Sequence, residues 1–352
     1  MNRKLVYIGF AFAHHKGTHA GYHQLESYLD YDYVIDCQSY FDEGQKVYSK
    51  WSIVRKLYRK LLRRLFHINN IPWYLVRILW LGLRYDNLVF HYIYGENVFF
   101  PWVKKLMRKG NIIVCTFHQP YSFFQTDQMW KNRIMKSDYI ILVGNTEVEN
   151  FKNMTGKDNV VYIPHGITTD YYAINYNIPK KNVVLTVGNW LRDYQFADMV
   201  YLKLLKDNPN IEIHIVSNPR NKEYITSSDR IKFMSGITDD ELREEYLKSS
   251  VLFLPLTRYT ANNSLLEASA TGCNIVIASD YPDNSYIPEK YLSIVKMNVE
   301  DAVVAIENKM SLEYNDSLST YVDNNYSWQV IADKIKLFLL SLKKNEDDKV
   351  QR

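Results

Sequence analysis

Short apolar runs alternate with helix-length segments through the first half of the chain. The runs lie at residues 4–12, 31–37, 86–93, 111–117, 139–144 and 160–165. Most are apolar at nearly every position, which is typical of strands buried on both faces of a parallel sheet. The alternation predicts a doubly wound α/β sheet with helices on both of its faces.

The same pattern begins again after a polar connection at 166–181 that contains Pro179. The sequence therefore predicts two Rossmann-like α/β domains that face a central cleft, where ligands bind at the carboxyl ends of the strands. We expect domains at 1–166 and 167–327, and at 328–352 a helix that returns to the first domain and a charged tail. The expected strands lie at 182–190, 211–217, 231–236, 251–256 and 274–279, and the expected helices at 195–206, 239–248, 264–271 and 328–342.

The composition is typical of a large folded protein and indicates the compartment in which it works. A chain of 352 residues that is 47% hydrophobic can fill two cores. Cys37, Cys115 and Cys273 are widely spaced, which indicates buried thiols in a reducing compartment rather than a disulfide framework. The chain enters a strand-like run without a signal-peptide pattern, and no apolar stretch is long enough to cross a bilayer. We expect a cytoplasmic protein.

The stretch ANNSLLEASA, after the run at 251–256, has the pattern of a helix N-terminus. Ser264 is the expected N-cap and Glu267 then falls three positions into the helix. Free N–H groups at such an end, from Asn262 to Leu265 and including Asn263, suit a phosphate. The carboxylate of Glu267 can accept hydrogen bonds from two neighbouring hydroxyls, as on a ribose. The alternative is that Glu267 only completes a capping box.

Gly188 and Arg192 follow the first strand of the second domain, in VGNWLRDY. Gly188 lets the backbone turn, and Arg192 then lies on the cleft side. Its planar guanidinium can pair with a diphosphate through two parallel hydrogen bonds. The alternative is a surface arginine that pairs with Asp193.

Two loops of the first domain reach the same cleft. Gly17 and Gly21 lie in the loop that follows the first strand, but they do not form a dinucleotide-binding G-x-G-x-x-G pattern. His118 follows the run at 111–117 directly and is a candidate for substrate binding or acid–base chemistry. The alternative for His118 is a structural histidine.

No metal site is expected. The loop after the first strand is rich in histidine, but no cysteine and no close acidic residue accompanies these side chains. Asp30 and Asp32 form an Asp-x-Asp, but they lie where a helix enters a strand and so at the opposite end of the sheet from the cleft. The histidines of the loop are His14, His15, His19 and His23.

Four segments, in order along nearly the whole chain, resemble the retaining nucleotide-sugar glycosyltransferases of the GT-B fold. This large family includes sucrose synthases and bacterial mannosyl- and glucosyltransferases of surface polysaccharides. NSLLEASATGCNIVIASD resembles the acidic helix motif of the family, and VYIPHGITTDYY its interdomain signature. SDYIILVGNTEVENF resembles the end of its first domain, and FMSGITDDELREEYLKSSVLFLPL the segment before the motif.

The resemblance implies a role for each candidate residue. Glu267 would bind the ribose hydroxyls, the backbone at Ser264 and Leu265 would meet the diphosphate, and Arg192 would neutralise it. Gly21 would lie near the diphosphate, and His118 would contact the transferred sugar. The first domain would bind the acceptor and the second the nucleotide-sugar donor, with no metal or other cofactor.

The implied chemistry is stabilisation of the departing phosphate. The bond between the anomeric carbon and the diphosphate breaks with oxocarbenium character, and preorganised donors hold the charge that develops. The family is thought to deliver the acceptor on the face of the leaving group, so that the phosphate takes its proton. The acceptor would be a glycan or a lipid-linked glycan of a surface polysaccharide.

The chain departs from the family pattern at two places. Tyr259 stands eight positions before Glu267, where the family has its first motif glutamate, and no lysine follows Arg192 in the next turn. A catalytically silent nucleotide-sugar-binding scaffold subunit, or a nucleotide-sugar epimerase of the same architecture, therefore remains an alternative.

No aspartate or glutamate occurs between Gly44 and Tyr85. At helical spacing, apolar residues fall on one side of this segment and basic residues on the other. Such a helix can lie on an anionic membrane, and we expect residues 46–84 to dock there, as a peripheral contact on the inner face of the membrane. The alternative is a helix with a solvated basic face, and the local charge fits nucleic acid poorly. The apolar residues are Trp51, Val54, Tyr58, Leu61 and Leu65, and the basic ones Arg55, Lys56, Arg59, Lys60, Arg63 and Arg64.

Overall fold

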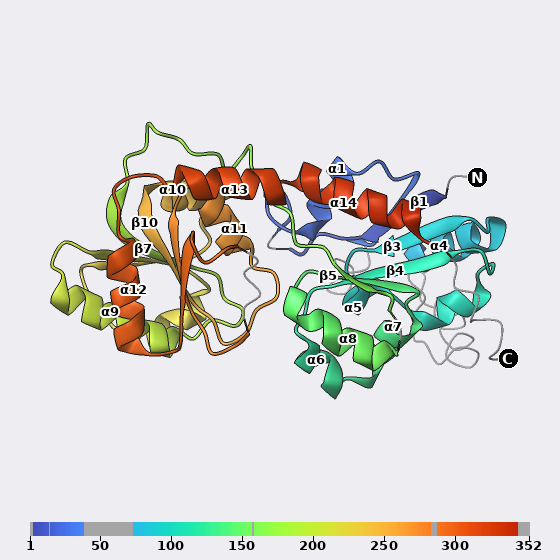
Figure 1. Ribbon diagram of the computed structural model, residues 1–352, viewed down its shortest axis with the longest axis horizontal. Helices are drawn as coiled ribbons and strands as arrows, with labels where there is room; N and C mark the ends of the chain where they lie inside the picture. The colour runs from blue at the N-terminus through green and yellow to red at the C-terminus, as the bar shows by residue number, and fades with distance from the viewer. Residues whose placement is uncertain (1–2, 14, 39–72, 157, 283–286, 344–352) are drawn as a thin grey trace, which may run out of the picture.

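The computed structural model shows two α/β domains side by side, each built on a parallel sheet of six strands (Figure 1). It describes residues 3–13, 15–38, 73–156, 158–282 and 287–343. The predicted fold class is confirmed, because each apolar run contains a strand and all pairings are parallel.

The first domain has the strand order β2-β1-β3-β4-β5-β6. Strands β3 and β4 are buried at every position, as their unbroken apolar runs predict. The strands are β1 (Lys4–Gly9), β2 (Tyr33–Asp36), β3 (Leu88–Tyr92), β4 (Ile112–Phe117), β5 (Tyr139–Leu142) and β6 (Val160–Tyr162). The helices are α1 (Leu25–Tyr28), α4 (Trp73–Arg84), α5 (Gly95–Val98), α6 (Tyr121–Thr126), α7 (Gln128–Lys136) and α8 (Val148–Thr155).

The second domain has the order β12-β11-β10-β7-β8-β9. Helices α9 and α12 pack together on one side of the sheet, and α10, α11 and α13 form a second contacting group. The strands are β7 (Lys181–Val187), β8 (Glu212–Val216), β9 (Ile231–Met234), β10 (Ser249–Pro255), β11 (Asn274–Ala278) and β12 (Leu292–Val295). The helices are α9 (Tyr194–Asp207), α10 (Asp239–Lys248), α11 (Asn263–Ala270), α12 (Val299–Lys309), α13 (Asp316–Tyr326) and α14 (Trp328–Ser341).

Helix α14 returns to the first domain, as the sequence predicts. Helices α13 and α14 run along the top of Figure 1, from the second domain to the first. Trp328, at the start of α14, is buried against the rings of Tyr28 and His165. At the far end, Arg3 Nε donates to the Leu342 carbonyl at 3.2 Å.

The two connections between the domains lie against each other. The Ile167 N–H donates to the Tyr326 carbonyl at 2.8 Å, and the Trp328 N–H donates to the Ile167 carbonyl at 3.0 Å. A Cβ at Gly166 would lie 2.4 Å from Trp328, so only glycine fits beside this ring. The polar connection at 166–181 therefore begins as a hydrogen-bonded crossing of two chain segments. The predicted domain boundaries at 166 and 327 stay predictions at the level of single residues.

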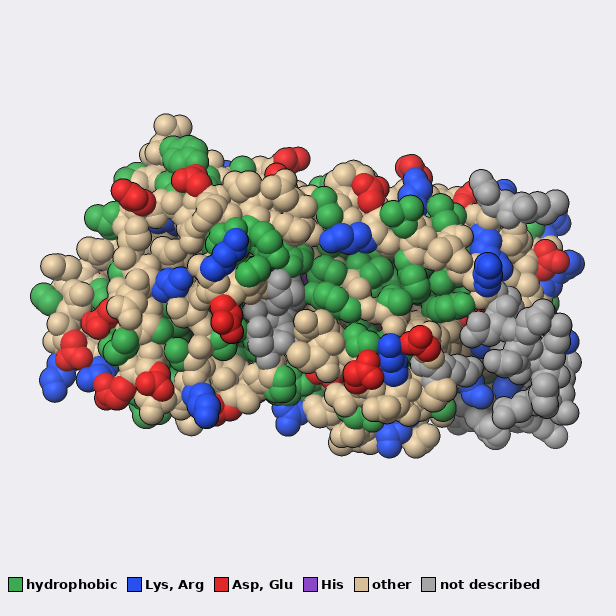
Figure 2. Space-filling model, viewed as in Figure 1, with side chains coloured by type: hydrophobic (Ala, Val, Ile, Leu, Met, Phe, Trp, Pro, Cys, Tyr) green, Lys and Arg blue, Asp and Glu red, His purple; other side chains and the backbone are tan. Residues whose placement is uncertain are grey.

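Charge is mixed on the surface. Acidic and basic side chains are interspersed on the face of both domains that Figure 2 shows. All three cysteines are buried and none forms a disulfide. In the residues that the structure describes, no helix is both apolar enough and long enough to span a bilayer. Of the segment 46–84, residues 46–72 lie outside the described part of the chain.

Candidate functional site

The candidate site lies where loops at the carboxyl ends of the two sheets meet. In the second domain the loops after β7 and β10 are adjacent, because these strands pair at the point where the strand order reverses. The Asp193 N–H donates to the Pro255 carbonyl at 2.9 Å, and the Thr257 N–H to the Leu191 carbonyl at 3.0 Å. Arg192 and the start of α11 are thereby brought together.

Helix α11 begins at Asn263, and its N-cap is Asn262. The Asn262 Oδ1 accepts from the Leu265 N–H at 3.3 Å and from the Ser264 hydroxyl at 2.7 Å. The predicted N-cap at Ser264 is therefore wrong, because the chain at Asn262 is still extended and the amide oxygen already caps the first turn. Glu267 then lies in the second turn, so the capping-box alternative for Glu267 is wrong as well.

Arg192 is a cation held by neutral groups. Its Nε donates to the Val187 carbonyl at 3.2 Å and its Nη1 to the Trp190 carbonyl at 2.7 Å. Its Nη2 donates to Asn262 Oδ1 at 3.1 Å and to Ser264 Oγ at 2.9 Å. Burial lowers the pKa of the guanidinium. The N-terminus of α11 and a partly buried cation that no carboxylate of the described residues contacts directly together favour an anion at this place.

No carboxylate of the described residues forms a salt bridge with Arg192. The Asp193 side chain instead caps α9, where it accepts from the Phe196 N–H at 2.9 Å. The alternative of a surface pair between Arg192 and Asp193 is therefore wrong.

Gly188 gives Arg192 its space. Its φ is +109°, and a Cβ there would lie 2.9 Å from Arg192 Nη2. The turn continues through Trp190 and Leu191. Leu191 adopts a φ of +59°, which is uncommon for a residue other than glycine. The turn therefore needs glycine at 188, both for its backbone and for the approach of the guanidinium.

Glu267 is a buried carboxyl, 3% exposed, that the neighbouring helix contacts. The Tyr246 hydroxyl of α10 donates to its Oε2 at 2.8 Å. Burial raises the pKa of Glu267 to about 7, while the bond from Tyr246 and the charge of Arg192 lower it. The contact of Tyr246 with Glu267 is not evident from the sequence, because only the packing of α10 on α11 brings the phenol to the carboxyl.

His118 follows β4 at the cleft, as predicted, and lies beside a second acidic residue. Its N–H donates to Glu96 Oε1 at 3.1 Å, and its Nδ1 is 3.3 Å from the same oxygen. The imidazole packs between the rings of Tyr22 and Tyr94. Neither ring nitrogen makes a hydrogen bond of ordinary geometry with the residues that the structure describes. Glu96 lies in α5, four residues after the end of β3, and a carboxylate in the loop region that follows a buried strand is the signal in the sequence that could have indicated it.

The loop after β1 reaches across the cleft. Gly21 has a φ of +98°, and a Cβ there would lie 3.0 Å from His15 and from His23. His19 donates from its N–H to Asp239 Oδ2 at 2.9 Å, and its Nδ1 is 2.7 Å from the same oxygen. The His19 ring also stacks on Tyr171, with 3.4 Å between ring centroids. Gly21 therefore lies in a loop of the first domain that is attached to the second.

Three further contacts join the domains beside the candidate residues. Arg258 Nη1 donates to Ser122 Oγ at 2.6 Å, and the Thr260 hydroxyl donates to the His118 carbonyl. Tyr281, whose ring lies 6.4 Å from that of buried Tyr259, donates its hydroxyl to Glu147 at 2.6 Å. The buried ring of Tyr259 thus occupies the position where the glycosyltransferase family that the sequence resembles has the first glutamate of its acidic motif.

Within the described residues, no three or more His, Cys, Asp or Glu side chains are grouped so that they could hold a metal ion. His14 lies outside that part of the chain. Asp32 accepts from the Leu5 N–H at 2.8 Å, near the amino end of β1 and away from the cleft.

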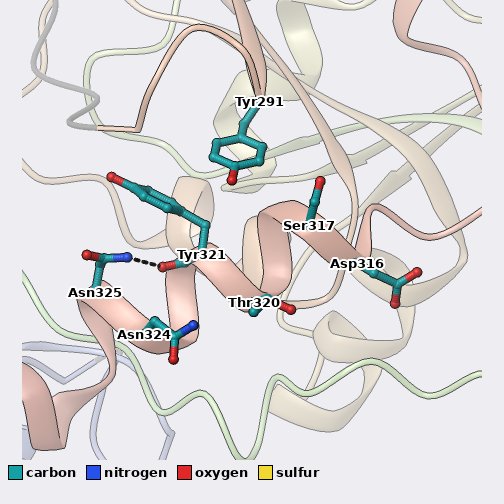
Figure 3. A pocket seen from close by; sticks show the side chains of 7 residues that line it. All are labelled: Tyr291, Asp316, Ser317, Thr320, Tyr321, Asn324 and Asn325. Atoms are coloured by element: carbon teal, nitrogen blue, oxygen red, sulfur yellow. Dashed lines mark hydrogen bonds between the residues drawn. The ribbon is translucent and has the colours of Figure 1, made fainter.

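A separate depression of about 460 Å³ lies on α13 (Figure 3). None of the predicted site residues lines it. Its side chains are mostly neutral and polar, and the Asn325 amide donates to the Tyr321 carbonyl at 2.8 Å. The lining residues are Tyr291, Asp316, Ser317, Thr320, Tyr321, Asn324 and Asn325.

Comparison with known proteins shows similarity at the level of structure. No protein-family model and no curated protein sequence matches the chain. The crystal structure of HepE from Anabaena, in complex with UDP and glucose, has a TM-score of 0.67 at 12% identity, over 97% of this chain and 100% of that one. Sucrose-phosphate synthase from Thermosynechococcus elongatus has a TM-score of 0.64 at 15% identity, over 96% and 98%. The lipopolysaccharide outer core galactosyltransferase WaaB has a TM-score of 0.61 at 13% identity, over 96% and 100%.

These matches extend over almost the whole length of both chains, so they include both domains and the returning helix. At such identities they establish the fold. The chain has the two-domain GT-B architecture of these proteins.

Proposed function

We propose that this protein is a glycosyltransferase that moves a sugar from a nucleotide-sugar donor to an acceptor glycan. The observation that carries the proposal is Arg192, a partly buried cation whose hydrogen-bond partners are all neutral, at the N-terminus of α11 and near the buried carboxyl of Glu267. A diphosphate supplies the missing negative charge, and a ribose supplies hydroxyls for the carboxylate. The complex of HepE with UDP-glucose supports a donor of this kind.

Each residue has a task in the proposed reaction. Arg192 and the first N–H groups of α11, at Asn263 and Ser264, stabilise the charge that develops on the departing diphosphate. Asn262 orients the guanidinium, since its Oδ1 accepts from Nη2. His118 contacts the transferred sugar from the other side of the cleft. Donors already in place in the folded protein lower the barrier without reorganisation during the reaction.

We propose retention of the anomeric configuration and independence from metal ions. The resemblance of the NSLLEASATGCNIVIASD segment to the acidic helix motif supports retention. Positive charge from Arg192 and from the α11 dipole can take the place of a divalent ion at the diphosphate. WaaB, whose name describes an enzyme of lipopolysaccharide, supports a role in surface polysaccharide synthesis.

The proposed acceptor is a glycan or a lipid-linked glycan at the inner face of an anionic membrane. Helix α4, the described end of the segment 46–84, exposes Trp73 (79%) and Trp80 (58%), with Val76 and Leu83 on the same face. Exposed Arg77 lies beside them. Tryptophan and basic side chains on one exposed face suit the boundary between lipid headgroups and acyl chains.

A catalytically silent scaffold subunit is the second candidate, and buried Tyr259 favours it. The test is incubation with nucleotide-sugars of uridine, adenosine, guanosine and thymidine, followed by chromatography. A transferase releases the free nucleoside diphosphate slowly even when water is the acceptor, whereas an epimerase yields an isomeric nucleotide-sugar. Recovery of every nucleotide-sugar unchanged, together with tight binding of one of them, would support the scaffold and contradict the transferase.

A further inference from the structure

Tyr246 of α10 and Glu267 of α11 meet inside the second domain. The tyrosine hydroxyl donates to Oε2 of the carboxyl at 2.8 Å, and both side chains are almost completely buried. From the residues that the structure describes, no hydrogen bond is seen to the other carboxyl oxygen, Oε1, and we take this oxygen as the one that meets a ligand. A phenol that donates to one oxygen of a carboxylate fixes the plane of the group and therefore the direction of the other oxygen.

Because no cation of the described residues pairs directly with the Glu267 carboxyl, the Tyr246 phenol is an important stabiliser of its charge. No basic side chain of the described residues forms a salt bridge with Glu267. Burial has the largest influence on the pKa of Glu267 and raises it, and the negative charge of Asp239 raises it further. Tyr246, Tyr172 and Arg192 lower this pKa, and Tyr246 has the largest effect of the three. Among the described residues, the Tyr172 hydroxyl has no hydrogen bond of ordinary geometry, and it lowers the pKa of Glu267 less than Tyr246 does.

Helix α10 holds Tyr246 firmly in place. Its first turn has a capping box, in which Thr238 and Glu241 bond to each other's backbone N–H groups. Arg243 Nε donates to the Tyr171 carbonyl, and Asp239 accepts from the first-domain loop at His19. The phenol is therefore fixed before any ligand arrives, which is what a preorganised site requires.

We propose that Tyr246 is a positioning residue for nucleotide binding: it orients the Glu267 carboxylate and stabilises its charge, so that Oε1 accepts from the ribose hydroxyls. Only the part of this inference that concerns the ribose rests on the proposed function. The contact itself involves Tyr246 and Glu267 in the free protein.

The charge of Glu267 then makes nucleotide affinity depend on pH. The ionised carboxyl is the better acceptor of hydrogen bonds. The affinity for the nucleotide is therefore highest above the Glu267 pKa of about 7 and falls as the pH drops through that value. Tyr246 donates to the ionised form and lowers this pKa, so removal of its hydroxyl moves the midpoint to higher pH.

The test compares wild type with Tyr246→Phe in two experiments. Carbon-13 NMR of labelled glutamate side chains, assigned with Glu267→Gln, gives the pKa of Glu267 in the free protein. Calorimetry with UDP from pH 6 to pH 9 gives the affinity. We expect both midpoints to rise by about one pH unit, and the affinity at pH 7 to fall about tenfold with a smaller loss at pH 9.

Tyr201→Phe is the matched control. Tyr201 is equally buried in the same domain, and its hydroxyl contacts Thr186 Oγ1 at 2.6 Å, away from the carboxyl. Its removal should leave both midpoints unchanged. A Glu267 titration in Tyr246→Phe that coincides with wild type overturns the inference. If instead the NMR midpoint moves and Glu267→Gln binds UDP as tightly as wild type, Tyr246 controls the carboxyl, and the proposed ribose role fails.

Discussion

At the scale of single residues, the candidate site consists of a buried carboxyl, Glu267, and a partly buried guanidinium, Arg192, that do not form a salt bridge with each other. The Arg192 guanidinium donates to carbonyl, amide and hydroxyl oxygens, and the Glu267 carboxyl accepts from a phenol. A charge removed from water without an ion pair is costly, and ionisable groups perturbed in this way cluster at functional sites. The arrangement therefore fits a ligand that carries both negative charge and hydroxyl groups.

Glu267→Gln should keep the fold and reduce nucleotide affinity. A neutral amide has the same shape but accepts hydrogen bonds from ribose hydroxyls less strongly, so we expect a loss of about tenfold or more at pH 8. Calorimetry measures the affinity and circular dichroism the fold. Glu244→Gln, an exposed position on α10, is the control and should bind as wild type. Equal affinities for both variants at pH 8 would contradict a ribose role.

Gly188→Ala should affect both stability and binding. The positive φ costs about 1–3 kcal/mol for a residue with a side chain, and the new Cβ pushes on the Arg192 guanidinium. Gly236→Ala provides the comparison, because Gly236 also has a positive φ but open space around its Cβ. We expect lower melting temperatures for both variants and weaker nucleotide binding for Gly188→Ala alone. Undiminished binding in Gly188→Ala would show that the arginine position is unimportant.

At the scale of elements, sequence periodicity located the strands β1 to β11 and the helices α9, α10, α11 and α14 but not their ends, and it did not predict α12 and α13. The expected helix at 264–271 is α11, Asn263–Ala270, one residue earlier, and this shift changed the cap and the place of Glu267 in the helix. Asn262 and Ser264 are both good caps, and only the loop from β10 decides between them. Strand β12 was missed, because Leu292–Val295 is short and only its first residue is fully buried.

Tertiary packing explains why part of the candidate site could not be predicted. Arg192, His118 and Glu267 stood out because they follow strands or begin a helix. Tyr246 contacts the site only after α10 packs on α11, and nothing in its local sequence indicates this contact. Glu96 reaches His118 because β3 and β4 are neighbours in the sheet, which the order of the runs alone does not give.

Helix α4 should contribute to membrane binding through its exposed face. Trp73→Ala with Trp80→Ala removes two exposed aromatic rings and should reduce sedimentation with phosphatidylglycerol vesicles severalfold at low salt. Leu337→Ala, which removes an exposed apolar side chain from α14, should sediment as wild type. Added salt should weaken binding of every variant, since basic side chains are attracted over about a Debye length. A wild-type chain that stays in solution at low salt contradicts the membrane proposal.

At the scale of the whole molecule, the first domain contacts the second around the candidate site. The His19 loop, Ser122 and Glu147 all reach residues of the second domain, and helix α14 joins the two domains on another side. One hydrophobic core includes β1 to β6 together with residues of α11 and α14. Residues of both domains therefore lie around the candidate site, an arrangement that would help to exclude water during the proposed transfer.

Catalysis should persist without divalent ions. Release of nucleoside diphosphate from the preferred nucleotide-sugar should proceed at an unchanged rate after dialysis against EDTA, because Arg192 and the N-terminus of α11 supply the positive charge. Manganese and magnesium, added back separately, should change the rate little. Complete loss in EDTA with recovery in either metal would show that a metal ion takes part.

The most direct test of the central claim is calorimetric binding of nucleoside diphosphates to wild type and to Arg192→Ala at pH 8. The proposal predicts that one of UDP, ADP, GDP and TDP binds wild type and that Arg192→Ala binds it at least tenfold more weakly, since a bond to a charged partner contributes about 1.5–3 kcal/mol. The same nucleotide at a hundredfold excess over its Kd should stabilise wild type by about 2.7 kcal/mol. Equal affinity in wild type and Arg192→Ala, or no binding of any of these nucleotides to wild type, would contradict a nucleotide-sugar site in this cleft.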